Sequence, residues 1–167
     1  MVERLIVYPP EIVDVDGGLI FIAGPIQGAP DWQTEAARTI HDADSGIVVA
    51  SPRKEYEPGT FKYELQVDWE TALLCKAGEM GIVAFWLARQ TILTPDRAYA
   101  QTSRFELAEW MMRHIYEGAK LTIGIEEGFG NERYIRRRFG QEVPDVKIAV
   151  SLFDTCKNAI ELLSDSK

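Results

Sequence analysis

The sequence predicts an α/β fold in which a mostly parallel, five-stranded sheet is covered by helices on both faces. Short, continuously apolar runs recur along the chain, as expected of strands that are buried on both faces. Segments with helical periodicity alternate with these runs, and such alternation is typical of a parallel sheet. The chain has 167 residues, of which 46% are hydrophobic. Because this length suffices for one good core and is short for two, residues 1–167 are expected to form a single domain.

The first half of the chain contains three expected strands. The run from Gly18 to Gly24 is apolar and ends at a glycine. Asp31 is then suited to cap a helix with apolar residues at helical spacing. The pattern predicts a second strand at 46–52, a helix at 62–79 and a third strand at 81–87. In a sheet of this kind, ligands bind at the carboxyl ends of the strands.

The second half continues the alternation after one long connection. Residues 88–101 contain Pro95 and show little periodicity, and a connection of this length is more often functional than idle. A helix follows in the stretch TSRFELAEWMM. Residues 1–17 are expected to form an arm or an edge strand, because prolines keep such a segment off the centre of a sheet. The remaining elements are expected at 120–125 (strand), 131–140 (helix), 147–152 (strand) and 153–163 (helix).

Composition argues against several classes of function. The formal charge of −8 is unfavourable for wrapping DNA or RNA and for binding an anionic membrane surface. Cys75 and Cys156 lack a CxxC or histidine-paired spacing, which favours reduced thiols over a disulfide or a metal site. No apolar run approaches the roughly 20 residues of a membrane span, and the N-terminus lacks the pattern of a signal peptide. A cytoplasmic protein with no membrane or nucleic acid partner is expected.

Glu106 supports two interpretations. Ser103-x-x-Glu106 before an apolar-periodic run is the pattern of a capping box at a helix start. Glu109 and Arg113 continue a polar stripe from Glu106 at helical spacing, which would leave the glutamate on a solvated face. Alternatively, a glutamate in the first turn after a strand and a long loop points into the substrate crevice of such a sheet. Paired with a second carboxylate about 5 Å away, it would act as a nucleophile at a sugar carbon.

Two further segments have structural and functional interpretations. The loop AGPIQGAPDW matches neither GxGxxG nor GxxxxGK[ST], so it predicts either a structural turn or a turn at which a small ligand approaches the backbone. Asp68 heads a helical row that continues through Ala72 and Cys75, which are small and uncharged. If it is buried, its carboxylate must be paired, hydrogen-bonded or protonated. If it is partly exposed, it is an ordinary acidic residue near a helix start.

Five motifs, in this order and at these spacings, resemble the nucleoside 2-deoxyribosyltransferase family, particularly its small bacterial and phage-type branch. They are IFIAGPIQGAPDWQTEA, YELQVDWETALL, GIVAFWLAR, SRFELAEWM and NERYIRRR, which together cover roughly residues 18 to 139. The resemblance implies a flavodoxin-like, Rossmann-like three-layer sandwich. It also implies a homo-oligomer whose sites are often completed by a neighbouring subunit, and transfer of 2-deoxyribose between bases through a covalent glycosyl-enzyme without a cofactor or metal.

The resemblance also implies roles for particular residues. Glu106 matches the nucleophilic glutamate of the family, and Asp68 matches an aspartate that contacts the base and supports its protonation. This division of labour is chemically reasonable, since a carboxylate stabilises and captures the sugar cation while protonation improves the leaving base. The residues expected to line the substrate site are Gly24, Pro25 and Gln27 on the sugar side, Asp96 as a second base-contacting acid, and Asn131 in the loop after the fourth strand.

The sequence departs from the family pattern at the first strand. The family has a tyrosine there that positions the nucleophile, whereas this chain has Ile20 and Phe21. Either Tyr63 or Tyr99 is expected to take over that role, or transferase activity is expected to be weak.

Two alternatives to deoxyribosyl transfer remain open. The first is a hydrolase of deoxynucleoside 5′-monophosphates, which needs a phosphate site formed by the glycines of the first loop, Ser103 and an arginine. The second is a non-catalytic nucleotide-sensing module that kept the pocket without turnover.

Overall fold

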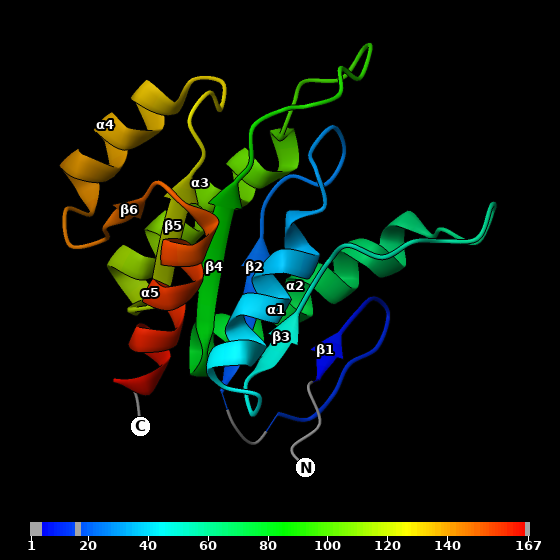
Figure 1. Cartoon of the computed structure of the whole chain (residues 1–167), viewed down its shortest axis with the longest axis horizontal. Coiled ribbons are helices and arrows are strands. Elements are labelled where there is room, and N and C mark those ends of the chain that lie inside the picture. The colour runs from blue at the N-terminus through cyan, green and yellow to red at the C-terminus, as the bar shows by residue number, and fades with distance from the viewer. Residues whose placement is uncertain (1–4, 16–17, 166–167) are drawn as a thin grey trace.

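The computed structural model describes residues 5–15 and 18–165, and in this part of the chain six parallel strands form one sheet (Figure 1). The strand order is β1-β3-β2-β4-β5-β6. This confirms the expected α/β fold with a mostly parallel sheet, with one strand more than expected. The strands are β1 (Ile6–Val7), β2 (Leu19–Ala23), β3 (Val48–Ala50), β4 (Ile82–Leu87), β5 (Leu121–Ile125) and β6 (Ile148–Ala149).

The additional strand lies in the N-terminal segment. Ile6 and Val7 pair in parallel with β3 at the edge of the sheet, which is the edge strand of the two alternatives expected for residues 1–17. Residues 1–4 and 16–17 of that segment lie outside the described residues. The chain after β1 is held by the indole of Trp69, which donates to the carbonyl oxygen of Glu11 at 2.6 Å.

Five helices in the described part of the chain cover the two faces of the sheet, and the three-layer arrangement is visible in Figure 1. One core packs α1 and α5 against the sheet, and the other packs α2, α3 and α4 against the opposite face. In β2, Ile20 and Ile22 belong to the first core, whereas Phe21 and Ala23 belong to the second. The helices are α1 (Trp32–Ala43), α2 (Tyr63–Met80), α3 (Gln101–Glu117), α4 (Glu132–Glu142) and α5 (Leu152–Ser164).

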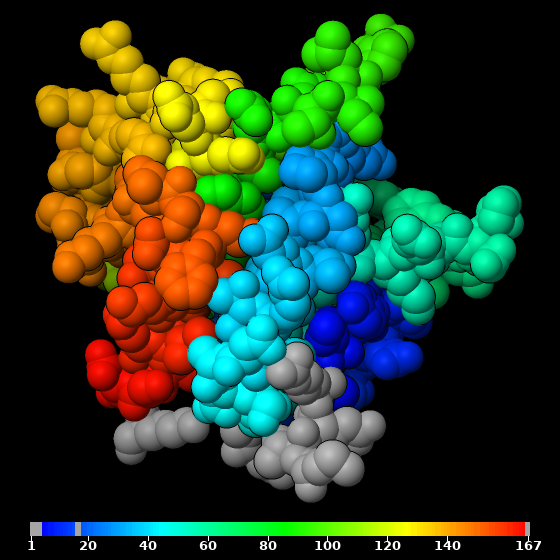
Figure 2. Space-filling view, in the orientation of Figure 1, coloured from blue at the N-terminus to red at the C-terminus, as the bar shows by residue number. Residues whose placement is uncertain are grey.

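The strand order places a topological switch point between β2 and β4. The chain leaves β2 toward β3 on one side, and it leaves β4 toward β5 on the other side. The two connections therefore diverge at the carboxyl ends of adjacent strands and leave a crevice between them, which is where parallel sheets bind ligands. The connections that leave this end of β3 and β4 protrude from the body of the molecule (Figure 2).

The two expected helix starts have different outcomes. Asp31 caps α1 as predicted, since its carboxylate accepts the backbone N–H of Thr34 at 3.2 Å. The capping-box interpretation of Ser103 and Glu106 is wrong, because α3 begins at Gln101, three residues before the start that an N-cap at Ser103 would give. Its N-cap residue, Ala100, is in the left-handed region with φ of 56° and contributes no side-chain cap. Ser103 and Glu106 therefore lie within the helix, where their side chains are free to face the crevice.

None of the helices in residues 5–15 and 18–165 has both the length and the apolar character needed to cross a membrane.

Candidate functional site

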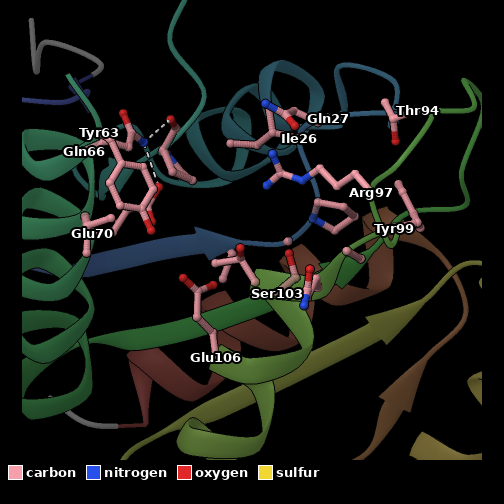
Figure 3. Close-up of a pocket in the computed structure, with 18 of the residues that line it drawn as sticks. Ile26, Gln27, Tyr63, Gln66, Glu70, Thr94, Arg97, Tyr99, Ser103 and Glu106 are labelled. Atoms are coloured by element: carbon pink, nitrogen blue, oxygen red, sulfur yellow. Dashed lines mark hydrogen bonds between the residues drawn. The ribbon is translucent and has the colours of Figure 1, made fainter. Parts of the chain in front are cut away.

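A cavity of about 400 Å³ lies at the carboxyl ends of β2 and β4 (Figure 3). Its volume is within the range of small-molecule sites, about 300–1,000 Å³. Six segments line it: the end of β2, the loop after β2, the extended segment after β3, the first turns of α2, the loop before α3 and the first turns of α3. The cavity therefore occupies the switch-point crevice that the strand order predicts.

The loop after β2 and the loop before α3 are joined by backbone hydrogen bonds. The carbonyl oxygen of Gly28 accepts from the N–H of Thr91 at 2.8 Å and of Ile92 at 3.1 Å. Gly28 has φ of 79°, and a Cβ there would lie 2.8 Å from the carbonyl oxygen of Ile92. A side chain would both strain this turn and separate the two loops, so the glycine has a structural reason to be here. The joined loops form one wall of the cavity.

Pro25 is also fixed in that wall. Its carbonyl oxygen accepts from the indole of Trp32 at 2.9 Å and from the amide of Gln33 at 3.4 Å. Gly24, Pro25 and Gln27 all line the cavity, as expected of residues that would contact the sugar.

Glu106 lies in the second turn of α3 and lines the cavity. It makes no hydrogen bond or ion pair within the described residues. Burial, the nearby carboxylate of Glu70 and that of Glu109 together raise the pKa of Glu106 from 4.5 to about 8. An acid that is half-buried in a cavity beside a second acid, with a pKa near neutrality, is a characteristic feature of catalytic sites.

Glu70 extends from α2 into the same cavity and is held by a hydrogen-bond network. The amide nitrogen of Gln66 donates to Glu70 Oε1 at 2.7 Å and to the carbonyl oxygen of Pro52 at 3.0 Å. The hydroxyl of Tyr56 donates to Gln66 Oε1 at 2.6 Å. Burial raises the pKa of Glu70, and the hydrogen bond from Gln66 opposes this rise. Figure 3 shows Glu70 and Glu106 on two different helices beside one cavity.

The cavity brings together some of the residues that the sequence indicated and leaves out others. Ser103, which is 5% exposed, lines it with Glu106 and the residues of the first loop. Asp68 is exposed on α2 and is absent from the lining. Asp96 is an exposed loop residue with φ of 62°, and Asn131 is exposed before α4 with φ of 64°. Neither of these two residues lines the cavity.

The two tyrosines expected to position Glu106 both line the cavity, but neither hydrogen-bonds to it. The hydroxyl of Tyr99 instead donates to the carbonyl oxygen of Ala88 at 2.7 Å. Burial is the main cause that raises the pKa of Tyr99 to about 12, so this hydroxyl keeps its proton. Tyr63 is 67% exposed at the cavity mouth.

Sequence reasoning missed Glu70 and Gln66, although the sequence contains a signal for them. Leu73 and Ala77 mark the buried face of α2. Extending that face toward the helix start at helical spacing leads to Gln66 and Glu70, and not to Asp68. Polar residues that continue a core-facing row beyond the sheet are expected to face the crevice at its end.

Two cations also line the cavity. Lys54 is occupied, since its Nζ donates to the carbonyl oxygen of Pro9 at 2.9 Å. Arg97 comes from the loop before α3, and Figure 3 shows it extending toward Ile26 and Gln27. Arg97 makes no hydrogen bond or ion pair within residues 5–15 and 18–165, so its guanidinium is available to an anionic group of a ligand.

Within the described residues, no group of three or more His, Cys, Asp or Glu side chains is arranged to hold a metal ion. No protein-family model matches the chain, and no curated protein matches it. The fold and the cavity thus define an α/β protein with a cavity of small-molecule size at the switch point.

Proposed function

We propose that the protein cleaves the N-glycosidic bond of a 2′-deoxynucleoside and transfers the 2-deoxyribose to another nucleobase through a covalent intermediate on Glu106. The observation that carries this proposal is the pair of carboxylates, Glu106 and Glu70, that project from two helices into one cavity. Glycosyl transfer with a covalent intermediate needs two such groups, one as nucleophile and one as proton donor and acceptor. The choice of 2-deoxyribose as the sugar and of the N-glycosidic bond as the bond cleaved rests on the resemblance of the sequence motifs to the nucleoside 2-deoxyribosyltransferase family.

The two carboxylates share one proton over a range of pH. Glu70 is one of the causes that raise the pKa of Glu106, so the two groups titrate as a coupled pair. In the reactive arrangement, Glu106 is ionised and the proton is on Glu70. The positive charge that develops on the sugar favours this arrangement, because an ionised Glu106 stabilises it.

The reaction then proceeds in two displacement steps. In the first step, the C1′–N bond breaks, its electron pair goes to the base, the base takes the proton from Glu70, and Glu106 bonds to C1′. In the second step, the acceptor base gives a proton to Glu70, its nitrogen attacks C1′, and Glu106 leaves as a carboxylate. The missing 2-hydroxyl makes the sugar cation easier to form. The reaction requires no cofactor.

Base exchange is expected to have a bell-shaped pH dependence. The pair loses its last proton near pH 8, the raised pKa of Glu106, so the rate is expected to fall above that pH, where no proton is left for the leaving base. At low pH, both carboxyls are protonated and no nucleophile is available. The measurement is kcat/KM for exchange on a panel of deoxynucleosides, followed by chromatography from pH 4 to 10. The proposal would be contradicted if the wild type neither exchanged bases nor released a free base at any pH.

A second candidate function is hydrolysis or transfer on deoxynucleoside 5′-monophosphates. Arg97 favours it, because its guanidinium lines the cavity and has no partner within the described chain. A planar guanidinium is well suited to bind a phosphate.

Replacing Arg97 separates the two candidates. If the substrate carries a 5′-phosphate, Arg97→Gln is expected to raise KM for the monophosphate by about 10-fold or more, because hydrogen bonds to charged groups contribute about 1.5–3 kcal/mol. KM for the unphosphorylated nucleoside should not change. Arg133→Gln, on the exposed side of α4, is the matched control. Equal KM values for wild type and Arg97→Gln on both substrates would assign no phosphate role to Arg97.

A further inference from the structure

The structure assigns Gln66 and Tyr56 a positioning role: together with the carbonyl oxygen of Pro52, we infer that they fix the proton of Glu70 on Oε2, so that this residue donates it to the leaving base. This inference rests on the proposed glycosyl transfer and identifies how its acid is prepared. None of the three groups is expected to touch the reacting atoms.

The orientation of the Gln66 amide follows from its partners. The carbonyl oxygen of Pro52 can only accept a hydrogen bond, so the atom 3.0 Å from it must be the amide nitrogen of Gln66. The amide oxygen then faces Tyr56, whose hydroxyl donates to it at 2.6 Å. The amide cannot flip without placing its oxygen against the Pro52 carbonyl.

The fixed amide decides which oxygen of Glu70 is available for a proton. Both amide hydrogens of Gln66 are used, one on Pro52 and one on Glu70 Oε1 at 2.7 Å. Oε1 is therefore an acceptor and cannot carry a proton toward Gln66. Oε2 has no partner in the described part of the chain. When Glu70 is protonated, the proton resides on Oε2, and Glu70 lines the cavity that receives the substrate.

The same hydrogen bond makes Glu70 a better proton donor. Donation from Gln66 stabilises the carboxylate form and lowers the pKa of Glu70 against the effect of burial. The other titratable or charged groups around this part of the cavity are Glu106 on α3, Tyr56 and Lys54 after β3, Tyr63 on α2, and Arg97 and Tyr99 before α3.

The test compares substrates that do and do not need an acid. In the first step, a nucleobase requires the Glu70 proton as the C1′–N bond breaks, whereas 4-nitrophenolate leaves 4-nitrophenyl 2-deoxyribofuranoside as a stable anion. We expect Gln66→Met to lower kcat for the best deoxynucleoside by about 10–100-fold, a fraction of the usual 10²–10⁴-fold contribution of an acid. The first-turnover release of nitrophenolate should stay near the wild-type rate. Tyr56→Phe should show a smaller loss of the same kind, and Gln141→Met on α4 should show none.

A pH profile supplies the second readout. Without the Gln66 hydrogen bond, the pKa of Glu70 rises, so the acid limb of the nucleoside profile is expected to move to higher pH in Gln66→Met. A structural defect alone would lower the rates for the nucleoside and for the nitrophenyl substrate together, and it would leave the acid limb of the nucleoside pH profile unchanged. Equal losses on both substrates, or no loss on either, overturn the inference.

Failure of the proposed function gives a different result. If the wild type releases neither base nor nitrophenolate, glycosyl transfer is wrong and the acid role is lost with it. The carboxyl ¹³C signal of Glu70 can then be titrated in wild type and Gln66→Met. An unchanged pKa would also overturn the positioning of Glu70, whereas a raised pKa would retain the positioning alone.

Discussion

Glu106→Gln is expected to abolish base exchange while making the fold more stable at alkaline pH. The substitution keeps the shape of the side chain but removes the anion that would bond to C1′. In covalent enzymes, loss of the nucleophile lowers kcat by on the order of 10³–10⁶-fold. Nitrophenolate release from the activated substrate should fall equally, because it needs the same nucleophile. The measurement is chromatographic base exchange and nitrophenolate release at pH 7.

The gain in stability follows from the raised pKa. In the folded chain Glu106 keeps its proton up to about pH 8, whereas in the unfolded chain the carboxyl releases it near 4.5. The stability that this protonation contributes is therefore present below pH 4.5 and is lost as pH rises through about 8. Glutamine has no such loss. We expect Glu106→Gln to increase the free energy of unfolding at pH 9 by about 1–3 kcal/mol, the cost of burying a poorly solvated polar group.

Chemical denaturation at a series of pH values measures this difference, which should disappear as the pH approaches 4.5. Glu117→Gln is the matched control, because Glu117 is exposed at the far end of α3 and pairs with Arg113 at 3.2 Å. That variant should keep wild-type exchange. Full activity in Glu106→Gln would exclude it as the nucleophile. If Glu106→Gln lost activity but its free energy of unfolding at pH 9 did not increase, the carboxyl of Glu106 would be better solvated than its place in the cavity indicates.

The fold could be predicted from the sequence because its central strands are buried on both faces. β2, β4 and β5 consist of fully buried residues, and such runs leave a continuous apolar signal that surrounding loops do not obscure. The start of α3 was not predictable in the same way. Ser103 and Glu106 have the spacing of a capping box, but Ala100 enters the left-handed region and starts the helix early. Only the path of the preceding loop decides whether the helix starts after Ser103 or already at Gln101.

Site residues that directly follow a strand could be predicted from the sequence. Site residues on a helix were harder to predict, because their position depends on which side of the helix faces the cavity. Gly24 and Pro25 follow β2 directly, so their place at the cavity follows from the sheet. Asp68 and Glu70 are two residues apart on α2, and two residues correspond to about 200° of rotation around a helix. A motif match that places a residue in the right turn of a helix can therefore fall on a side chain that does not line the cavity. Arg97, in an aperiodic loop, has no signal of this kind.

Glu70→Gln and Asp68→Asn are expected to have opposite outcomes, although both remove a carboxylate from the same turn of α2. Glu70→Gln should lower kcat for nucleoside exchange by about 10²–10⁴-fold, since it removes the proposed proton donor. Asp68→Asn should exchange at the wild-type rate, because Asp68 is exposed and does not line the cavity. The first turnover of nitrophenolate release, which forms the glycosyl-enzyme without an acid, should be retained in both variants, and this separates the acid from the nucleophile.

Glu70→Gln should also shift the titration of Glu106. Without the neighbouring anion, one of the causes that raise the pKa of Glu106 disappears, so its pKa should fall below about 8. For the activated substrate, the rising limb of the pH profile should then move to lower pH. A large loss in Asp68→Asn with normal exchange in Glu70→Gln would reverse the assignment. Because Asp68 faces outward from its own cavity, such a result would require the acid to act in the site of a second copy of the chain. Mixing Asp68→Asn with Glu106→Gln would then restore activity, which two defects in one cavity cannot do.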